Sequence, residues 1–159
     1  MTDTPSRLGR YELIAEIGRG GMADVKLAVQ RGSAGFERLV VLKVLHADLA
    51  RDPVIVEMMR DEAKLSALIK HPNIIEVFDA GTLPDGRLYL VMEYLTGRNL
   101  YDEIQDLGTL PLGRACRIIR AVARAIRAAH DVGIIHRDLK PDNVMFVPLP
   151  EGEGETVKV

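Results

Sequence analysis

The sequence predicts an α+β fold in which a five-stranded antiparallel sheet with one helix precedes a mainly helical part. Three observations support this prediction. Within the first 94 residues, short apolar runs alternate with turn-forming segments, as in antiparallel sheets. Apolar residues recur at helical spacing over 53–70 and again over 111–133. The 159 residues, 47% of them hydrophobic, are enough for one ordinary domain or two small lobes.

The composition excludes several classes of function. A net charge of −2 offers no excess of cations for a long footprint on nucleic acid, so no nucleic-acid partner is expected. The single cysteine, Cys116, excludes an intramolecular disulfide and a cysteine-based metal cluster. Because no apolar run could cross a bilayer and residues 1–10 lack the apolar core of a signal peptide, we expect a cytoplasmic chain without a membrane segment. The sequence carries no indication of the oligomeric state.

A glycine-rich turn follows the first predicted strand, residues 11–17. The turn reads Gly18-Arg19-Gly20-Gly21-Met22-Ala23-Asp24-Val25 and leads into a second strand. A hairpin tip without bulky side chains lets backbone amides close over phosphates. Dinucleotide-binding domains open on similar glycine spacing, but a helix follows there, whereas the alternation of Val25, Leu27 and Val29 with polar or small residues indicates a strand. Taken alone, the motif fits a simple tight turn equally well.

Lys43 is the one charge in the apolar part of the next predicted strand, residues 38–45. A lysine in a buried strand is costly unless an anion meets it; the alternative is an edge-strand lysine whose ammonium reaches solvent. The helix that begins at Asp52-Pro53 offers an anion, because Glu62 falls on the same stripe as Ile55, Met58, Leu65 and Ile69. We therefore expect a Lys43–Glu62 ion pair, although a glutamate at the edge of the stripe would simply be solvated.

Two further strands, at 74–80 and 87–94, complete the predicted sheet. The apolar run then stops at Gly97, which indicates an interdomain connection. The predicted organisation is listed by segment: a polar leader at 1–10, an N-terminal lobe at 11–94, a hinge at 95–98 and a C-terminal lobe at 99–159.

Two helices open the second part. Asn99 caps a short helix that ends before Gly108, and a long helix runs from Pro111 to Gly133. One side of the long helix carries arginines at positions 114, 117, 120, 124 and 127. A solvated face explains them better than a nucleic-acid or membrane surface, because no aromatic residues are interleaved for base stacking. Short strands follow at 144–146 and from Thr156 onward.

The loop His136-Arg137-Asp138-Leu139-Lys140-Pro141-Asp142-Asn143 concentrates polar chemistry. Asp138, Lys140 and Asn143 place a proton acceptor, a cation and an amide oxygen close together in the sequence, and Pro141 restricts the backbone between them. A helix before the loop and a strand after it would hold these groups in place. The histidines of the chain show no metal-ligand spacing.

The order of these motifs resembles the serine/threonine protein kinases of the eukaryotic-like type found in bacteria. Glycine turn, strand lysine, helix glutamate and the Arg-Asp-Leu-Lys-Pro loop follow one another over practically the whole chain from Tyr11 onward. The resemblance implies a kinase-like fold, with the sheet and its helix as the N-lobe and the mainly helical part as the start of the C-lobe. It also implies ATP-dependent phosphoryl transfer to a serine or threonine of a protein substrate, with Mg²⁺ as a cofactor.

The resemblance also assigns roles to individual residues. Asp138 accepts or orients the proton of the substrate hydroxyl, Lys140 neutralises the transferred phosphoryl group, and Asn143 binds Mg²⁺. Lys43 contacts the α- and β-phosphates, and Glu62 fixes it. The remaining implied ATP-binding residues are Ile17, Gly18, Arg19, Gly20, Gly21, Met22, Ala23, Val25, Val41, Met92 as gatekeeper, Glu93 and Leu95 through their backbone, and Met145 beneath the adenine.

The sequence departs from the family pattern in three places. Ala23 stands where a third glycine is usual, and Val41 replaces the usual alanine above the adenine, which narrows the base pocket without excluding ATP. No Asp-Phe-Gly occurs, and the sequence ends just before the position where the family has it. Because that Asp is the other magnesium ligand, we expect an N-terminal portion of a kinase domain that has little or no activity alone. The alternative is a non-catalytic nucleotide-binding or regulatory module.

Overall fold

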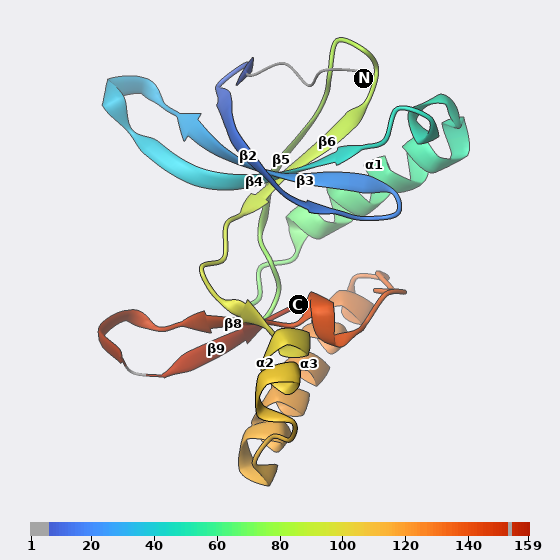
Figure 1. Ribbon diagram of the computed structural model, residues 1–159. Helices are drawn as coiled ribbons and strands as arrows, with labels where there is room; N and C mark the ends of the chain where they lie inside the picture. Colours follow the sequence, from blue (N-terminus) through green and yellow to red (C-terminus); the bar gives the residue numbers. More distant parts are fainter. Residues whose placement is uncertain (1–6, 153) are drawn as a thin grey trace. The chain divides into compact units, whose positions relative to one another are not determined.

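The computed structural model describes residues 7–152 and 154–159, except for the side chains of Ala34, Glu62, Leu65 and Glu151. The described residues form two compact units (Figure 1). The first contains the described residues up to Ala67 together with Val77–Tyr94, and the second contains Leu68–Glu76 and Leu95–Val159.

The first unit is built on a curled antiparallel sheet of six strands in the order β1-β2-β3-β4-β6-β5 (Figure 1). The strands are β1 (Arg7–Leu8), β2 (Tyr11–Arg19), β3 (Ala23–Arg31), β4 (Glu37–Leu45), β5 (Val77–Thr82) and β6 (Leu88–Glu93). Five of them match the predicted strands. The sixth, β1, lies in the segment predicted to be a polar leader, and it joins the sheet because Leu8 is buried opposite Tyr11.

The two faces of this sheet pack into separate cores. On one face, Val40, Leu42 and Val44 of β4 are buried together with Leu8 and Tyr11. On the other face, Leu45 packs with Leu88 and Leu90 of β6 against α1 (Pro53–Leu68). The central strand β4 is therefore buried on both sides, which explains why its sequence is an almost continuous apolar run rather than an alternating one.

The buried stripe of α1 differs from the predicted one. Met58 was predicted to face inward but is 43% exposed, whereas Met59 is 7% exposed and packs on the sheet with Ala63. Both Met58 and Met59 lie at helical spacing from Ile55, three and four residues on, so periodicity alone does not choose between them. Contact with the sheet selects the face that carries Met59.

A polar cluster joins β2 to β5 within the first unit. The Tyr11 hydroxyl donates to Asp79 Oδ2 at 2.8 Å, and Arg10 Nη2 donates to the same oxygen at 2.9 Å. The backbone N–H of Ala80 donates to the other carboxylate oxygen. Burial opposes ionisation of Asp79, but these hydrogen bonds, from Tyr11 first and then Arg10, outweigh it and lower the pKa of the carboxyl group.

The second unit combines two helices with a small sheet. The helices are α2 (Leu100–Leu107) and α3 (Leu112–Asp131), and the sheet contains β7 (Arg98–Asn99), β8 (Met145–Pro148) and β9 (Glu155–Lys158) in the order β7-β8-β9. Ile118 of α3 packs with Val144, Phe146 and Val157 to form the core. The Asn99 side chain accepts a hydrogen bond from the backbone N–H of Asp102 at 2.7 Å, which confirms the predicted cap of α2.

The segment before β5 belongs to the second unit, although a strand was predicted from residue 74. The backbone N–H of Ile75 donates to the carbonyl of Val159, and the N–H of Val159 donates to the carbonyl of Asn73, both at 3.0 Å. The Asn73 side chain also donates to the carbonyl of Val157 at 2.7 Å. Residues 73–75 thus extend the pairing of the C-terminal strand, and β5 begins only at Val77.

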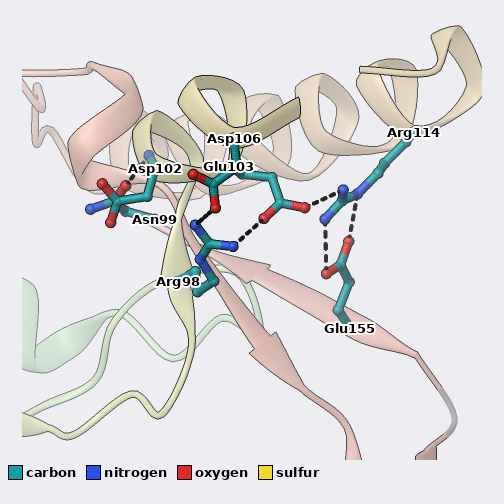
Figure 2. Close-up of polar contacts among 7 residues, drawn as sticks. All are labelled: Arg98, Asn99, Asp102, Glu103, Asp106, Arg114 and Glu155. Atoms are coloured by element: carbon teal, nitrogen blue, oxygen red, sulfur yellow. Dashed lines mark hydrogen bonds and ion pairs between the residues drawn. The ribbon is translucent and has the colours of Figure 1, made fainter. Parts of the chain in front are cut away.

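Ion pairs join α2, α3 and the small sheet (Figure 2). Arg114 donates to Glu103 of α2 at 2.6 Å and to Glu155 of β9 at 2.9 Å, and Arg98 pairs with Glu103 and Asp106. The prediction of a solvated arginine face on α3 is therefore wrong for Arg114, which lies half-buried over the Phe146 ring. The arginines at 117, 120, 124 and 127 are exposed, in agreement with that prediction.

None of the helices within residues 7–152 and 154–159 combines the length with the apolar character that crossing a membrane requires.

Replacement of Gly97 by alanine is expected to destabilise the second unit by about 3 kcal/mol or more. A Cβ atom at Gly97 would overlap the carbonyl oxygen of Phe146, and backbone cannot move aside as a flexible side chain can. Gly113→Ala in α3 is the matched control, because its Cβ would meet nothing closer than an Arg117 nitrogen at 3.7 Å. We expect the control to gain about 0.5 kcal/mol from higher helix propensity in urea denaturation; equal effects of the two variants would contradict the close approach.

Replacement of Tyr11 by phenylalanine is expected to lower the free energy of unfolding of the first unit by about 1 kcal/mol at pH 7. Because the folded-state pKa of Asp79 is lowered, its contribution is fully present above the unfolded value of about 4 and is lost as pH falls through the folded value. The difference between wild type and Tyr11→Phe should therefore shrink near pH 2. Tyr89→Phe, which removes a neighbouring hydroxyl, should show no such pH dependence; the same loss for Tyr11→Phe at both pH values would count against the Asp79 cluster.

Candidate active site

The glycine-rich turn is shorter than predicted because both flanking strands extend into it. β2 continues to Arg19 and β3 begins at Ala23, so only residues 20–22 form the tip. The backbone N–H of Gly20 donates to the carbonyl of Ala23 at 2.9 Å and closes the turn. A Cβ at Gly20 would lie 3.3 Å from that carbonyl, whereas one at Gly21 would meet no atom within 4 Å. The tip therefore presents mainly backbone, as a phosphate-binding turn requires.

The predicted nucleotide-binding side chains of the first unit share one face of the sheet. Val25 of β3 stands opposite Lys43 of β4, and Lys43 stands opposite Leu90 of β6. Two residues before Lys43 on β4, Val41 stands opposite Met92 of β6. Because side chains alternate along a strand, Val25, Val41 and Lys43 all point to the same side. The Lys43 side chain is half-buried there, between apolar neighbours.

Glu62 comes from the helix that packs on this same face. Met59 and Ala63 of α1 contact the cluster that contains Leu45 and Leu90, so the helix lies on the side to which Lys43 points. Glu62 follows Met59 by three residues and therefore lies near the buried stripe of α1. Its side chain is outside the described part of the structure, so the Lys43–Glu62 ion pair stays a prediction.

Three of the residues in the predicted adenine site lie near the position in the sequence where the first unit ends and the second continues. Met92 and Glu93 are the last two residues of β6, and Leu95 is the first residue of the chain after the first unit. Met92 packs against the cluster under α1, and Met145 begins β8 in the second unit. Ile17 is exposed on β2, next to the turn.

Three predicted catalytic residues meet in the loop between α3 and β8. Asn143 Nδ2 donates to the carbonyl oxygen of Asp138 at 2.8 Å and to its Oδ2 at 3.1 Å. Lys140 Nζ lies 3.3 Å from the same Oδ2. The side chains of Asp138 and Lys140 are exposed, so the carboxylate is open to a substrate.

Local backbone structure explains why these three residues meet. Pro141 starts the 3₁₀ turn η3 (Pro141–Asn143), in which the N–H of Asn143 donates to the carbonyl of Lys140 at 3.0 Å. This single turn brings Asn143 back toward Asp138. On the other side, the N–H of Asp138 donates to the carbonyl of His136 at 2.9 Å, which folds the start of the loop.

These contacts stabilise the charged form of Asp138. The hydrogen bond from Asn143 lowers the pKa of the Asp138 carboxyl most, followed by that from Lys140, and the positive charge of Lys140 adds to the effect. The carboxylate is therefore ionised at neutral pH and available as a hydrogen-bond acceptor.

The donor set fits part of a magnesium site. Residues 7–152 and 154–159 contain no group of three or more His, Cys, Asp or Glu side chains that could hold a metal ion by themselves. Asn143 directs its NH₂ group at Asp138, so its carbonyl oxygen is left to act as a ligand. Mg²⁺ is often held by one or two protein oxygens together with phosphate oxygens and water, and Asn143 suits that arrangement.

Comparison with known families decides the identity of this chain. Residues 11–158 match the protein kinase domain. The chain belongs to the protein kinase domain family.

Similar kinases are known from bacteria. The serine/threonine-protein kinase pkn3 of Myxococcus xanthus is 41% identical over 150 residues, which cover 94% of this chain and 27% of that protein. The serine/threonine-protein kinase PknB of Mycobacterium tuberculosis is 44% identical over 147 residues, which cover 90% of this chain and 23% of PknB. The chain thus spans about a quarter of the length of these relatives.

A solved structure confirms the predicted kinase-like α+β fold. The crystal structure of the Mycobacterium tuberculosis PknI kinase domain superposes with a TM-score of 0.79 at 30% sequence identity. The match covers 96% of this chain and 59% of the PknI chain.

One feature of the kinase loop was missed by reasoning from the sequence. Arg137 has a φ of +62°, and it is the one non-glycine residue with positive φ in the part of the chain that the structure describes. Such a conformation costs about 1–2 kcal/mol for an L-residue and occurs often at functional sites. Arginine does not favour it, so the residue type offered no signal. The strained residue directly precedes Asp138.

Replacement of Asn143 by alanine is expected to raise the pKa of Asp138 toward its ordinary value, because the hydrogen bond from Asn143 is the largest contribution to the lowering. Lys140→Met should raise it less. The Asp138 carboxyl can be followed by carbon-detected NMR titration. Asp142→Asn is the control, since Asp142 lies in the same turn without a described contact to Asp138; a shift as large in this control would show a general change of loop charge instead.

Proposed function

We propose that this kinase chain is part of an enzyme that transfers the γ-phosphoryl group of ATP to serine or threonine hydroxyls of a protein substrate. The observation that carries the proposal is the convergence of Asn143 and Lys140 on one ionised oxygen of Asp138. Because the chain belongs to the protein kinase domain family, we interpret this arrangement as the part of the site that acts on the substrate hydroxyl.

The loop of the second unit supplies the chemistry at the substrate hydroxyl. Asp138 accepts or orients the hydroxyl proton while the oxygen attacks the γ-phosphorus, and the bond to the β–γ bridging oxygen breaks to release ADP. Asn143 holds the Asp138 carboxylate in one orientation. Lys140, whose ammonium is 3.3 Å from that carboxylate, neutralises charge on the transferred group.

The first unit supplies the nucleotide-binding groups. In the proposal, the ammonium of Lys43 meets the α- and β-phosphates, and Glu62 fixes it. Val25 and Val41 share the face of Lys43 and contact the adenine. The remaining proposed contacts are the segment from Gly18 to Ala23, which includes Arg19, with Ile17 before it, the backbone of Glu93 and Leu95, Met92 as gatekeeper, and Met145.

The carbonyl oxygen of Asn143 would hold Mg²⁺, which when bound supplies positive charge for the phosphates. The other acidic ligand of the family motif is not among the 159 residues. We therefore propose that this polypeptide, taken alone, binds nucleotide but does not transfer phosphate. The second candidate, a non-catalytic nucleotide-binding or regulatory module, is favoured by the same observation.

Nucleotide binding should depend on Lys43. We expect the 159-residue chain to bind a fluorescent ATP analogue, and Lys43→Met to weaken binding at least tenfold because an ion pair with phosphate is lost. Lys64→Met is the control, since Lys64 is an exposed lysine on α1 paired with Asp61. An equal loss in both variants, or none in Lys43→Met, would overturn the assignment of Lys43.

A phosphotransfer assay separates the two candidates. The 159-residue chain is expected to leave a generic serine/threonine substrate unmodified. A longer protein that includes this chain should phosphorylate the substrate, and Asp138→Asn should abolish that activity if the enzyme proposal holds. If the longer protein binds nucleotide without turnover, the module is the correct function.

A further inference from the structure

A row of alternating charges runs along the hairpin that carries the glycine-rich turn. Lys26 Nζ lies 3.4 Å from Glu16, Glu16 accepts from Arg19 Nε at 2.6 Å, and Arg19 Nε lies 3.9 Å from Asp24. The row ends at His46, whose Nε2 is 3.0 Å from Asp24 Oδ1. Among these residues only Arg19 was named above as a proposed nucleotide contact, and none of the four ion pairs has a part in that proposal.

Strand register explains why these side chains meet. Glu16 stands opposite Lys26, and Arg19 stands opposite Asp24. Asp24 stands opposite Val44, so His46, two residues beyond Val44, is its diagonal neighbour on the same face. This face is the one opposite to Lys43 and Val25, because side chains alternate along the strands. The row therefore lies on the face opposite to the proposed nucleotide-binding face, and it can affect the phosphates only through the conformation of the turn.

His46 is attached to the turn by its backbone as well as its ring. Its N–H donates to the carbonyl of Met22 at 3.0 Å, so one residue contacts both the tip of the turn and the first residues of β3. The side chains are partly shielded, with Asp24 21% and His46 28% exposed. Ion pairs that are partly removed from solvent are screened less than fully exposed ones.

The contact between the His46 ring and Asp24 joins the residue after β4 to the start of β3. Hydrogen bonds in which the acceptor is a carboxylate are stronger than those between two neutral groups. Loss of either side chain should therefore loosen the attachment of the turn.

We propose that Asp24 and His46 are positioning residues whose side-chain contact holds the glycine-rich turn in its nucleotide-binding conformation. Nucleotide affinity then falls when either side chain can no longer make this contact. The inference rests on the proposed nucleotide-binding function of the turn.

The test compares wild type with His46→Ala, Asp24→Ala, the double variant and His46→Arg by binding of a fluorescent ATP analogue at one fixed pH. Each single alanine variant should bind about threefold more weakly than wild type, and the double variant no more weakly than either, because all three lack the same contact. His46→Arg can still donate to Asp24 and should bind as wild type does.

The double variant decides between positioning through this contact and separate effects of the two side chains on the nucleotide. If the losses of the single variants add in the double variant, or if neither single variant binds more weakly than wild type, the proposal is overturned.

Amide hydrogen exchange without nucleotide provides a second readout. The N–H groups of Gly20 and His46 report on the closure of the turn and on its attachment to His46. After correction for intrinsic exchange rates, both should be about threefold better protected in wild type and in His46→Arg than in His46→Ala. Equal protection would refute the positioning role. If protection differs as expected while no variant binds the analogue, the nucleotide-binding function fails and the positioning role stands.

Discussion

The burial of β4 on both of its faces is the constraint on which the rest of the first unit depends. Val40, Leu42 and Val44 fill one core, and Leu45 joins α1 in the other. A strand in this position tolerates a charge only where a partner or ligand compensates it. In the proposal, Glu62 and the nucleotide phosphates compensate Lys43 on the face of the sheet that α1 covers, so packing and proposed function select the same position.

The proposed catalytic loop of the second unit depends on local backbone geometry instead of burial. Pro141 begins a single 3₁₀ turn, and that turn returns Asn143 to Asp138. Because the contacts are short-range in sequence, the loop needs only a helix end before it and a strand after it. This division is typical of enzymes, in which a packed scaffold holds an exposed loop whose side chains remain accessible to substrate.

Much of the candidate site could be predicted because each motif carries its own physical reason. A glycine turn between strands, a lysine in an apolar strand and a polar loop braced by proline are all local in sequence. The inward face of α1, the ion pairs of Arg114 and the strain at Arg137 could not be predicted in the same way. They arise from contacts with residues distant in the chain, or from a conformation that the residue type does not favour.

The sequence by itself determined the kinase family, the order of the main helices and strands from Tyr11 onward, and the position of the candidate catalytic loop. Periodicity, turn residues and motif spacing are properties of neighbouring positions in the sequence. Only the tertiary structure decided which stripe of α1 is buried, that residues 73–75 pair with the C-terminal strand, and that His46 meets Asp24 behind the glycine turn. The physical reason is that these contacts depend on strand register and on helix rotation about its axis. Strand register and helix rotation are both set by packing across the fold, because the local sequence is compatible with more than one register and more than one rotation.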